Sequence, residues 1–216
     1  MSIYSSIVGF FQDGGLFMYP IVIVLAFGTA IAVERWFYLT TTAASSKSLW
    51  SKITPYIRAG KFAEAVSLTQ KSSAALATLL EYGLKRSKTT RRRDDVEKAM
   101  EESLMEIMPR LEKRTHYLAT FANIATLLGL LGTIIGLIRA FTAVSGANPA
   151  EKADLLSASI SVAMNTTAFG LMVAIPMLLI HTLLQTKTTE LVDSLEMASV
   201  KFMNTIFENG EEGNPA

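Results

Sequence analysis

Three segments of this sequence are long and apolar enough to cross a lipid bilayer, and they constrain the fold more than any other feature. They run from Leu16 to Val33, from Phe121 to Val144 and from Ile160 to Leu184. Each is close to the roughly 20 residues that span a hydrocarbon core about 30 Å thick. Inside hydrocarbon a lone segment satisfies its backbone polar groups only as a helix. The sequence therefore predicts an all-α integral membrane protein with three transmembrane helices.

Composition agrees with this class and excludes several others. Half of the 216 residues are apolar and 18% are charged, which indicates a membrane protein with a modest water-soluble part. Without cysteine there is no disulfide framework and no thiolate metal site, and two distant histidines make no metal site. A net charge of +1 gives no reason to expect a nucleic-acid partner. No basic segment precedes the first apolar run, so we expect that run to remain as a span.

The basic residues predict the orientation. None precedes the first span, 16 of the 20 lie between Arg35 and Arg114, and most of the others follow the second span. Because cytoplasmic loops carry the excess of Lys and Arg, the N-terminus is expected outside and the long loop and the tail in the cytoplasm. The run Arg91 to Arg93 is expected to be solvated or attracted to phospholipid head groups rather than to bind a nucleotide.

These signals predict seven parts: an interfacial helix (1–15), the first span (16–38), a cytoplasmic helical domain (39–120), the second span (121–144), a short outer loop (145–158), the third span (159–184) and a C-terminal cytoplasmic helix with a disordered tail (185–216). Within the cytoplasmic domain, helices are expected over 47–57, 62–70 and 74–85, the last with a stripe of Leu76, Leu79, Leu80 and Leu84. From Asp94 the chain is expected to be helical almost without interruption into the second span, with Pro109 as a site of kinking.

Small residues recur at steps of three and four in the second and third spans. They are Gly129, Gly132 and Gly136 in the second span, and Ala163, Gly170 and Ala174 in the third. Small faces let helix backbones approach closely in lipid, where packing and hydrogen bonds drive association. Taken alone, the glycines favour simple helix packing.

Hydroxyl and amide groups accompany these faces. Thr133 lies near the middle of the second span, and Asn165, Thr166 and Thr167 are consecutive in the third. Polar residues inside a membrane often mark an ion pathway. Neither span contains Asp, Glu or Lys, so an ion pathway here would need a carboxylate from another chain.

Two further residues are candidates for the cytoplasmic side of such a pathway. Histidine can act as a proton shuttle, but His181 lies near the cytoplasmic end of the third span, where an interfacial role is favoured. Glu34 lies beside Arg35 at the water boundary of the first span, and an interfacial pair is the favoured interpretation. No nucleophile, metal cluster or phosphate-binding motif is present, so no catalytic residue and no enzymatic activity are predicted.

Several stretches resemble one known family. LATFANIATLLGLLGTIIGLIRAF (118–141) is similar to the second span of the ExbB/TolQ/MotA proton-channel family, in its ExbB and TolQ branch. TTAFGLMVAIPMLLIH (166–181) resembles the third span of that branch, with its threonine, glycine and Ala-Ile-Pro. FQDGGLFMYPIVIVLAFGTAIAVERWFYL resembles the first span, and GKFAEAVSLTQKSSAALATLLEYGLKR the cytoplasmic helices.

The resemblance implies a subunit of an ion-driven motor in the bacterial inner membrane, with the N-terminus in the periplasm. Five copies would surround a central pore that holds the single spans of two ExbD- or TolR-like partners, each supplying one aspartate. Proton flow would move the partner and transmit work, through a TonB- or TolA-like protein, to TonB-dependent transport or envelope maintenance. By position, Thr133 and Thr167 are the pore threonines and Pro176 is the proline that kinks the third span. No cofactor is implied.

Two residues depart from the pattern of the branch. Thr126 stands where a proline usually precedes Leu-Leu-Gly, which leaves the helix straighter. Val162 stands where the branch has a glutamate, five residues before the pore threonine. Without that carboxylate, Na⁺ stays open beside H⁺ as the coupling ion, with Asn165 and Thr166 as additional oxygen ligands. A non-conducting membrane scaffold, in which the glycine faces only pack, is the other alternative.

Overall fold

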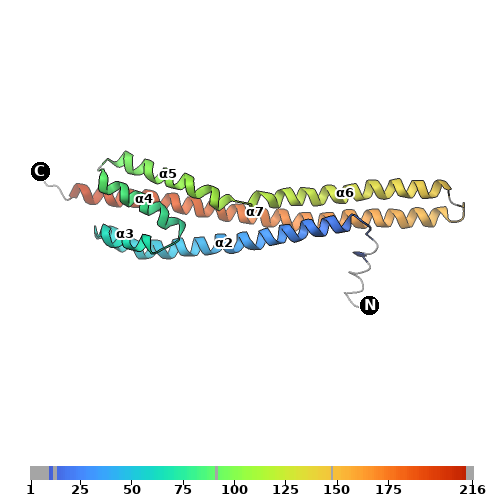
Figure 1. Cartoon of the computed structure of the whole chain (residues 1–216), viewed down its shortest axis with the longest axis horizontal. Helices are drawn as coiled ribbons and strands as arrows, with labels where there is room; N and C mark the ends of the chain where they lie inside the picture. Colours follow the sequence, from blue (N-terminus) through green and yellow to red (C-terminus); the bar gives the residue numbers. More distant parts are fainter. Residues whose placement is uncertain (1–9, 12–13, 91, 147, 213–216) are drawn as a thin grey trace. The chain divides into compact units, whose positions relative to one another are not determined.

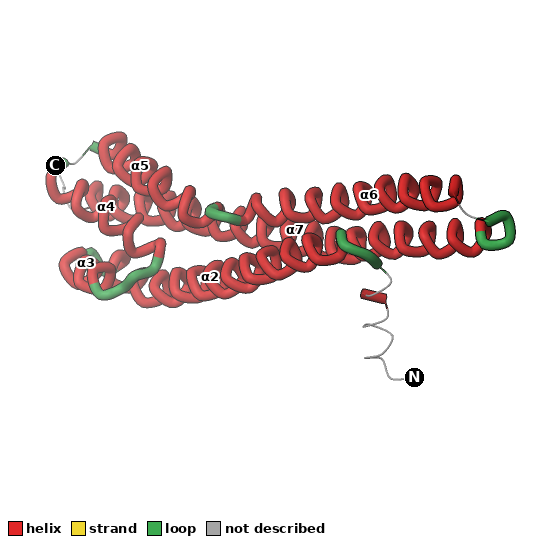
Figure 2. Tube along the Cα trace, turned by 45° about the vertical axis from the view of Figure 1, so that its right-hand side comes forward, coloured by secondary structure: helices red, strands yellow, loops and turns green. Residues whose placement is uncertain are grey.

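The computed structural model describes residues 10–11, 14–90, 92–146 and 148–212, and every regular element of this part is a helix (Figures 1 and 2). The longer helices are α2 (Met18–Arg58), α3 (Phe62–Gln70), α4 (Ala75–Thr89), α5 (Arg93–Glu112), α6 (Thr115–Gly146) and α7 (Lys152–Glu212). Three stretches are long and apolar enough to cross a membrane, within Met18–Arg58, Arg93–Gly146 and Lys152–Phe207. The prediction of an all-helical chain with three such helices is confirmed.

Several boundaries differ from those expected. The helix expected over 47–57 is the end of α2, and the C-terminal helix expected after 184 is the end of α7. Helix α7 begins at Lys152, within the segment expected as a loop over 145–158, and has Asp154 in its first turn, where a carboxylate favours helix formation. Helix α3 has the expected bounds. The interfacial helix expected over 1–15 lies largely outside the described residues, although the described rings of Phe10 and Phe11 contact Phe169 edge-on.

The chain divides into two compact units. The first comprises the described residues up to Glu34 together with Arg114 to Leu183, and it therefore holds the apolar parts of α2, α6 and α7. The second comprises Arg35 to Lys113 and the chain from Leu184 onward, with α3, α4 and α5. Helices α2 and α7 contribute to both.

In the first unit α6 and α7 lie side by side and run antiparallel (Figures 1 and 2). We call their contact the small-residue seam; it consists of Gly129, Gly132 and Gly136 on α6 and Ala163, Thr166, Thr167 and Gly170 on α7. A β carbon built on Gly132 would lie 2.5 Å from Cγ2 of Thr166, and one built on Gly136 would lie 2.7 Å from Cβ of Ala163. These distances leave no room for a methyl group. Glycine is therefore required for the helices to approach this closely.

Leucine dominates the core of the second unit. The expected stripe on α4 is buried, with Leu76, Leu79, Leu80 and Leu84 each at most 2% exposed. Helix α4 packs on α5, and α3 packs on α4. A β carbon on Gly83 would lie 2.8 Å from both Sδ of Met100 and Cε1 of Phe202, so α4, α5 and α7 meet at this glycine.

The chain is helical from Arg93 to Gly146, as expected, except for one short break. Helix α5 ends at Glu112, α6 begins at Thr115, and Arg114 between them has a φ of 66°. A left-handed residue cannot continue a right-handed helix, so the break occurs here. Pro109, the expected site of kinking, lies inside α5.

Glu34 and Arg35, expected as an interfacial pair, contact different parts of the chain. Glu34 pairs with Arg114 at 2.8 Å, and both side chains are about half exposed. Arg35 is 3% exposed, donates a hydrogen bond to the carbonyl of Leu111 and lies 4.8 Å from the ring centroid of Tyr38. Neighbours on a helix point in directions about 100° apart, which explains why the two side chains reach different partners.

Gly170→Ala tests the seam. Its β carbon would meet backbone atoms that cannot rotate away, the carbonyl oxygen of Ala125 at 2.7 Å and Cα of Gly129 at 3.1 Å. We expect a loss of about 1–3 kcal/mol of stability, measured as a lower melting temperature of the purified chain in detergent. Gly146→Ala on α6 is the control, because nothing lies within 4 Å of its β carbon. Equal melting temperatures for the two variants would contradict this packing.

Candidate functional site

The polar residues expected from the sequence gather at one level of the first unit. Gly132 lies opposite Thr166, and Gly136 lies opposite Ala163. This antiparallel register places Thr133 within about one helical turn of Thr166 along the axis. Thr133, Asn165, Thr166 and Thr167 thus form what we call the polar level of the seam.

Thr166 is the buried member of the polar level. It is 2% exposed, and its hydroxyl lies 2.6 Å from the carbonyl oxygen of Gly14 and 2.9 Å from that of Val162. A hydroxyl carries a single hydrogen, so the two carbonyls share it. This side chain fastens the turn before α2 to α7, and its methyl group fills the space left by Gly132. The contacts of Thr166 are those of a packing residue.

Thr133 and Thr167 are less buried, and their hydroxyl hydrogens are already engaged. Thr167 donates across the helix pair to the carbonyl of Gly129 at 2.8 Å. Thr133 donates to the carbonyl of Leu130 in its own helix at 2.6 Å. Each oxygen keeps lone pairs that accept hydrogen bonds or coordinate a cation. In this arrangement both threonines offer acceptors.

Asn165 supplies the complementary chemistry. Its side chain is half-buried and forms no hydrogen bond with any other described residue. A primary amide carries two donor hydrogens and one acceptor oxygen. Asn165 can therefore donate to an anion at the level where the two threonines accept.

Val162, which the resemblance places at the position of a glutamate, faces the turn before α2. A β carbon on Gly15 would lie 3.1 Å from Cγ1 of Val162, and Gly15 has a φ of 71° that favours glycine. An apolar side chain suits this contact, and the spans bring no acid of their own to the polar level.

The remaining candidates lie elsewhere. His181 is half-buried and follows Thr167 by 14 residues, about 21 Å along α7. The carboxylate of Glu34 is occupied by Arg114. Pro176 is exposed inside α7, which continues as helix on both sides, and Ala174 is 2% exposed. Among the described residues no cluster of three or more His, Asp or Glu side chains could hold a metal ion.

Sequence reasoning did not find the contacts of Thr166 with Gly14 or of Arg35 with Leu111. They join residues 152 and 76 positions apart. Local spacing carries no signal for pairs of this kind. The glycine pair Gly14 and Gly15, directly before an apolar run, indicates a turn there but does not predict its contact with α7.

Fold and site together define an all-helical membrane protein in which two of three apolar helices interlock through small residues beside a level of hydroxyl and amide groups. Comparison with known proteins agrees. A model of the MotA/TolQ/ExbB proton channel family matches residues 71–197, more than half of the chain. The chain belongs to this family, in its ExbB/TolQ branch.

Individual relatives extend the similarity. The chain is 26% identical over 199 residues to a protein of Methanothermobacter thermautotrophicus named as an ExbB homolog, covering 91% of this chain and 69% of that protein. It is 27% identical over 167 residues to a Synechocystis protein named ExbB-like 3, covering 77% and 79%. It is 42% identical over 66 residues to the TolQ protein of Haemophilus influenzae, covering 31% and 28%.

Thr166→Val tests the packing role of this residue. The variant keeps the methyl group against Gly132 and leaves the carbonyl of Gly14 without its donor, so we expect a loss of about 1 kcal/mol of stability. Thr142→Val is the matched control on α6, since that exposed hydroxyl bonds only to Ile138 of its own helix. Melting temperatures in detergent compare the two. A Thr166 variant as stable as its control would show that the bond to Gly14 contributes nothing.

Proposed function

We propose that this chain is the channel subunit of an ExbB/TolQ-type stator of the bacterial inner membrane, which couples ion flow to work in the periplasm. The observation that carries the proposal is the polar level, where Thr133, Asn165 and Thr167 lie beside a tightly packed seam in spans without an acid. Such a level is suited to receive a charge that another chain supplies. Membership of the proton channel family supports the same conclusion.

The proposed assembly is a homopentamer around a central pore, with the N-terminus in the periplasm and the C-terminus in the cytoplasm. The pore would hold the single spans of two ExbD- or TolR-like partners. Gly129 and Gly132 are buried against α7 of their own chain, so they are not available to line a shared pore. The pore surface would come from the residues flanking the seam, with Thr133, Asn165 and Thr167 as its polar groups.

The free donors and acceptors of the polar level suggest how it would form hydrogen bonds with an aspartate of the partner. The two threonines, whose hydrogens are engaged, accept a hydrogen bond from the protonated acid. Asn165 donates to the ionised carboxylate, whose burial at mid-membrane costs about 3 kcal/mol on insertion scales. The level therefore accommodates both protonation states. Each charge that crosses 100 mV releases about 2.3 kcal/mol, which would drive the partner between docked positions.

The coupling ion is proposed to be H⁺. With Val162 in place of the glutamate, the aspartate of the partner would be the only proton carrier at this level. Na⁺ is the second candidate, favoured by the available oxygens of Thr133, Thr167 and Asn165. The work powered would be TonB-dependent transport or envelope maintenance through a TonB- or TolA-like protein.

Thr133→Val and Thr167→Val test ion coupling. Each variant removes an acceptor for the protonated acid, and a hydrogen bond between neutral groups is worth about 0.5–1.5 kcal/mol, so both should reduce ion flux roughly two- to tenfold. Flux would be measured in liposomes that contain the chain and the single-span protein that co-purifies with it. Thr133→Ser should retain flux, and Thr142→Val is the control outside the polar level. A non-conducting scaffold predicts instead that both valine variants behave as the wild type.

The partner and the ion are tested on the same preparation. We expect the co-purifying protein to carry an aspartate in its single span, and flux to continue in Na⁺-free buffer while a protonophore abolishes activity in cells. Flux that stops when Na⁺ is removed would assign Na⁺ as the coupling ion. A partner without an acidic residue in its span would contradict the proposal as a whole.

A further inference from the structure

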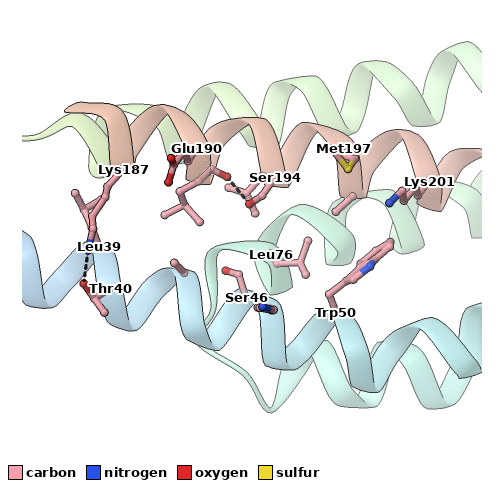
Figure 3. A pocket seen from close by; sticks show the side chains of 15 residues that line it. Leu39, Thr40, Ser46, Trp50, Leu76, Lys187, Glu190, Ser194, Met197 and Lys201 are labelled. Atoms are coloured by element: carbon pink, nitrogen blue, oxygen red, sulfur yellow. Dashed lines mark hydrogen bonds between the residues drawn. The ribbon is translucent and has the colours of Figure 1, made fainter. Parts of the chain in front are cut away.

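A groove lies between α2 and α7 in the second unit, and the ion pathway proposed above does not use it. Its volume is about 490 Å³, within the range of about 300–1,000 Å³ in which small-molecule sites fall. Leu76 of α4 reaches into the space between the two helices (Figure 3). We call this space the α2–α7 groove.

The floor of the groove is apolar. It is formed by Leu39, Ala43, Leu76, Leu191, Leu195 and Ala198. Trp50 rises from α2 toward α7 at one end, beside Lys201 (Figure 3). The opposite end is closed by Lys187, whose amine lies 3.3 Å from Oγ1 of Thr40 and 3.5 Å from the ring centroid of Trp36. A hydrocarbon chain fits such a floor, since it buries apolar surface on both sides.

The charges around the groove favour an anion. Three lysines line it, Lys47, Lys187 and Lys201, against a single carboxylate, that of Glu190. Lys187 is occupied by Thr40 and Trp36, whereas Lys47 and Lys201 form no ion pair with any described residue. A second cavity of about 300 Å³ shares Trp50 and Lys201 with the groove and adds Arg58. Positive charge is therefore concentrated at the Trp50 end.

Ser46 adds a buried polar atom to the groove, between Thr40 and Trp50 (Figure 3). It is 5% exposed, and its hydroxyl has no hydrogen-bond partner among the described residues. Other hydroxyls of α2, such as those of Ser45 and Ser51, donate to carbonyls of their own helix. Ser46 precedes Trp50 by four residues, one turn of α2, and lies on the wall of the groove (Figure 3). A buried polar group without a partner costs free energy, so a ligand that satisfies it is favoured.

We propose that the α2–α7 groove binds a single-chain anionic amphiphile, a fatty acid with a carboxylate head and one hydrocarbon chain. The head lies beside Trp50, between Ser46 and Lys201, where the hydroxyl of Ser46 and the amine of Lys201 are the donors that face its oxygens. The chain follows the leucine floor toward Leu39. A free inorganic anion would leave the floor uncovered, and a neutral hydrocarbon would leave Ser46 and Lys201 unused.

Fluorescence of Trp50 tests the site in the full chain, in nanodiscs of phosphatidylcholine. The chain has two tryptophans, so Trp36→Phe leaves Trp50 as the reporter and keeps an aromatic ring beside Lys187. The probe is 5-doxyl stearate, whose quenching group lies near its carboxylate. We expect saturable quenching that dodecanoate reverses by competition, and at least tenfold weaker binding of the methyl ester of the probe.

Variants separate the site from the bilayer. Lys201→Glu should weaken binding at least tenfold, whereas Lys52→Glu, an exposed lysine of α2 outside the groove, should not. Ser46→Ala should weaken binding and leave the melting temperature of the ligand-free chain unchanged or higher, because it removes an unsatisfied hydroxyl. Equal binding by Lys201→Glu and Lys52→Glu, or by acid and ester, would overturn the proposal.

Two further outcomes would assign the groove differently and overturn the proposal. Competition by inorganic phosphate alone as strong as that by dodecanoate would show a site for free anions. If neither 5-doxyl stearate nor acrylamide quenches the fluorescence of Trp50 in the intact assembly, another protein chain fills the groove. Neither outcome depends on ion flux, so the test is independent of the proposed stator function.

Discussion

The size of the side chains between two helices in hydrocarbon limits how closely their backbones can approach. In this protein α6 and α7 meet through residues with small side chains or none. The absence of a β carbon at Gly129 exposes its carbonyl, and the hydroxyl of Thr167 reaches that carbonyl from the opposite helix. Packing and polar chemistry are therefore one interaction. The geometry that brings the backbones together also engages the hydroxyl hydrogen of Thr167, whereas that of Thr133 is engaged within its own helix.

At the turn before α2, packing and hydrogen bonding are again combined in one residue. Thr166 fills the space opposite Gly132 with its methyl group and holds Gly14 with its hydroxyl, so a single side chain connects three segments. Val162 covers Gly15 next to it. The apolar side chain of Val162 thus fits the turn and brings no carboxylate to the polar level.

The features predictable from the sequence were local ones. Apolar length gave the three spans, and periodicity gave α3 and the buried leucine stripe of α4, because each depends on residues a few positions apart. The break at Arg114 was missed because no glycine or proline lies next to it, whereas Pro109 is an obvious helix breaker. The partners of Glu34, Arg35 and Thr166 were missed because they lie far along the chain. The unsatisfied hydroxyl of Ser46 becomes visible only once α2 and α7 are packed.

The hydrogen bond between Thr166 and Gly14 can form only late in the synthesis of the chain. Its two residues are 152 positions apart, and chains grow at about 5–20 residues per second, so the carbonyl of Gly14 waits roughly 8–30 s for its donor. During this interval α2 is already made while its leading turn has no lasting partner. The arrival of α7 then completes the seam and the turn together. The last span made is the one that locks the first.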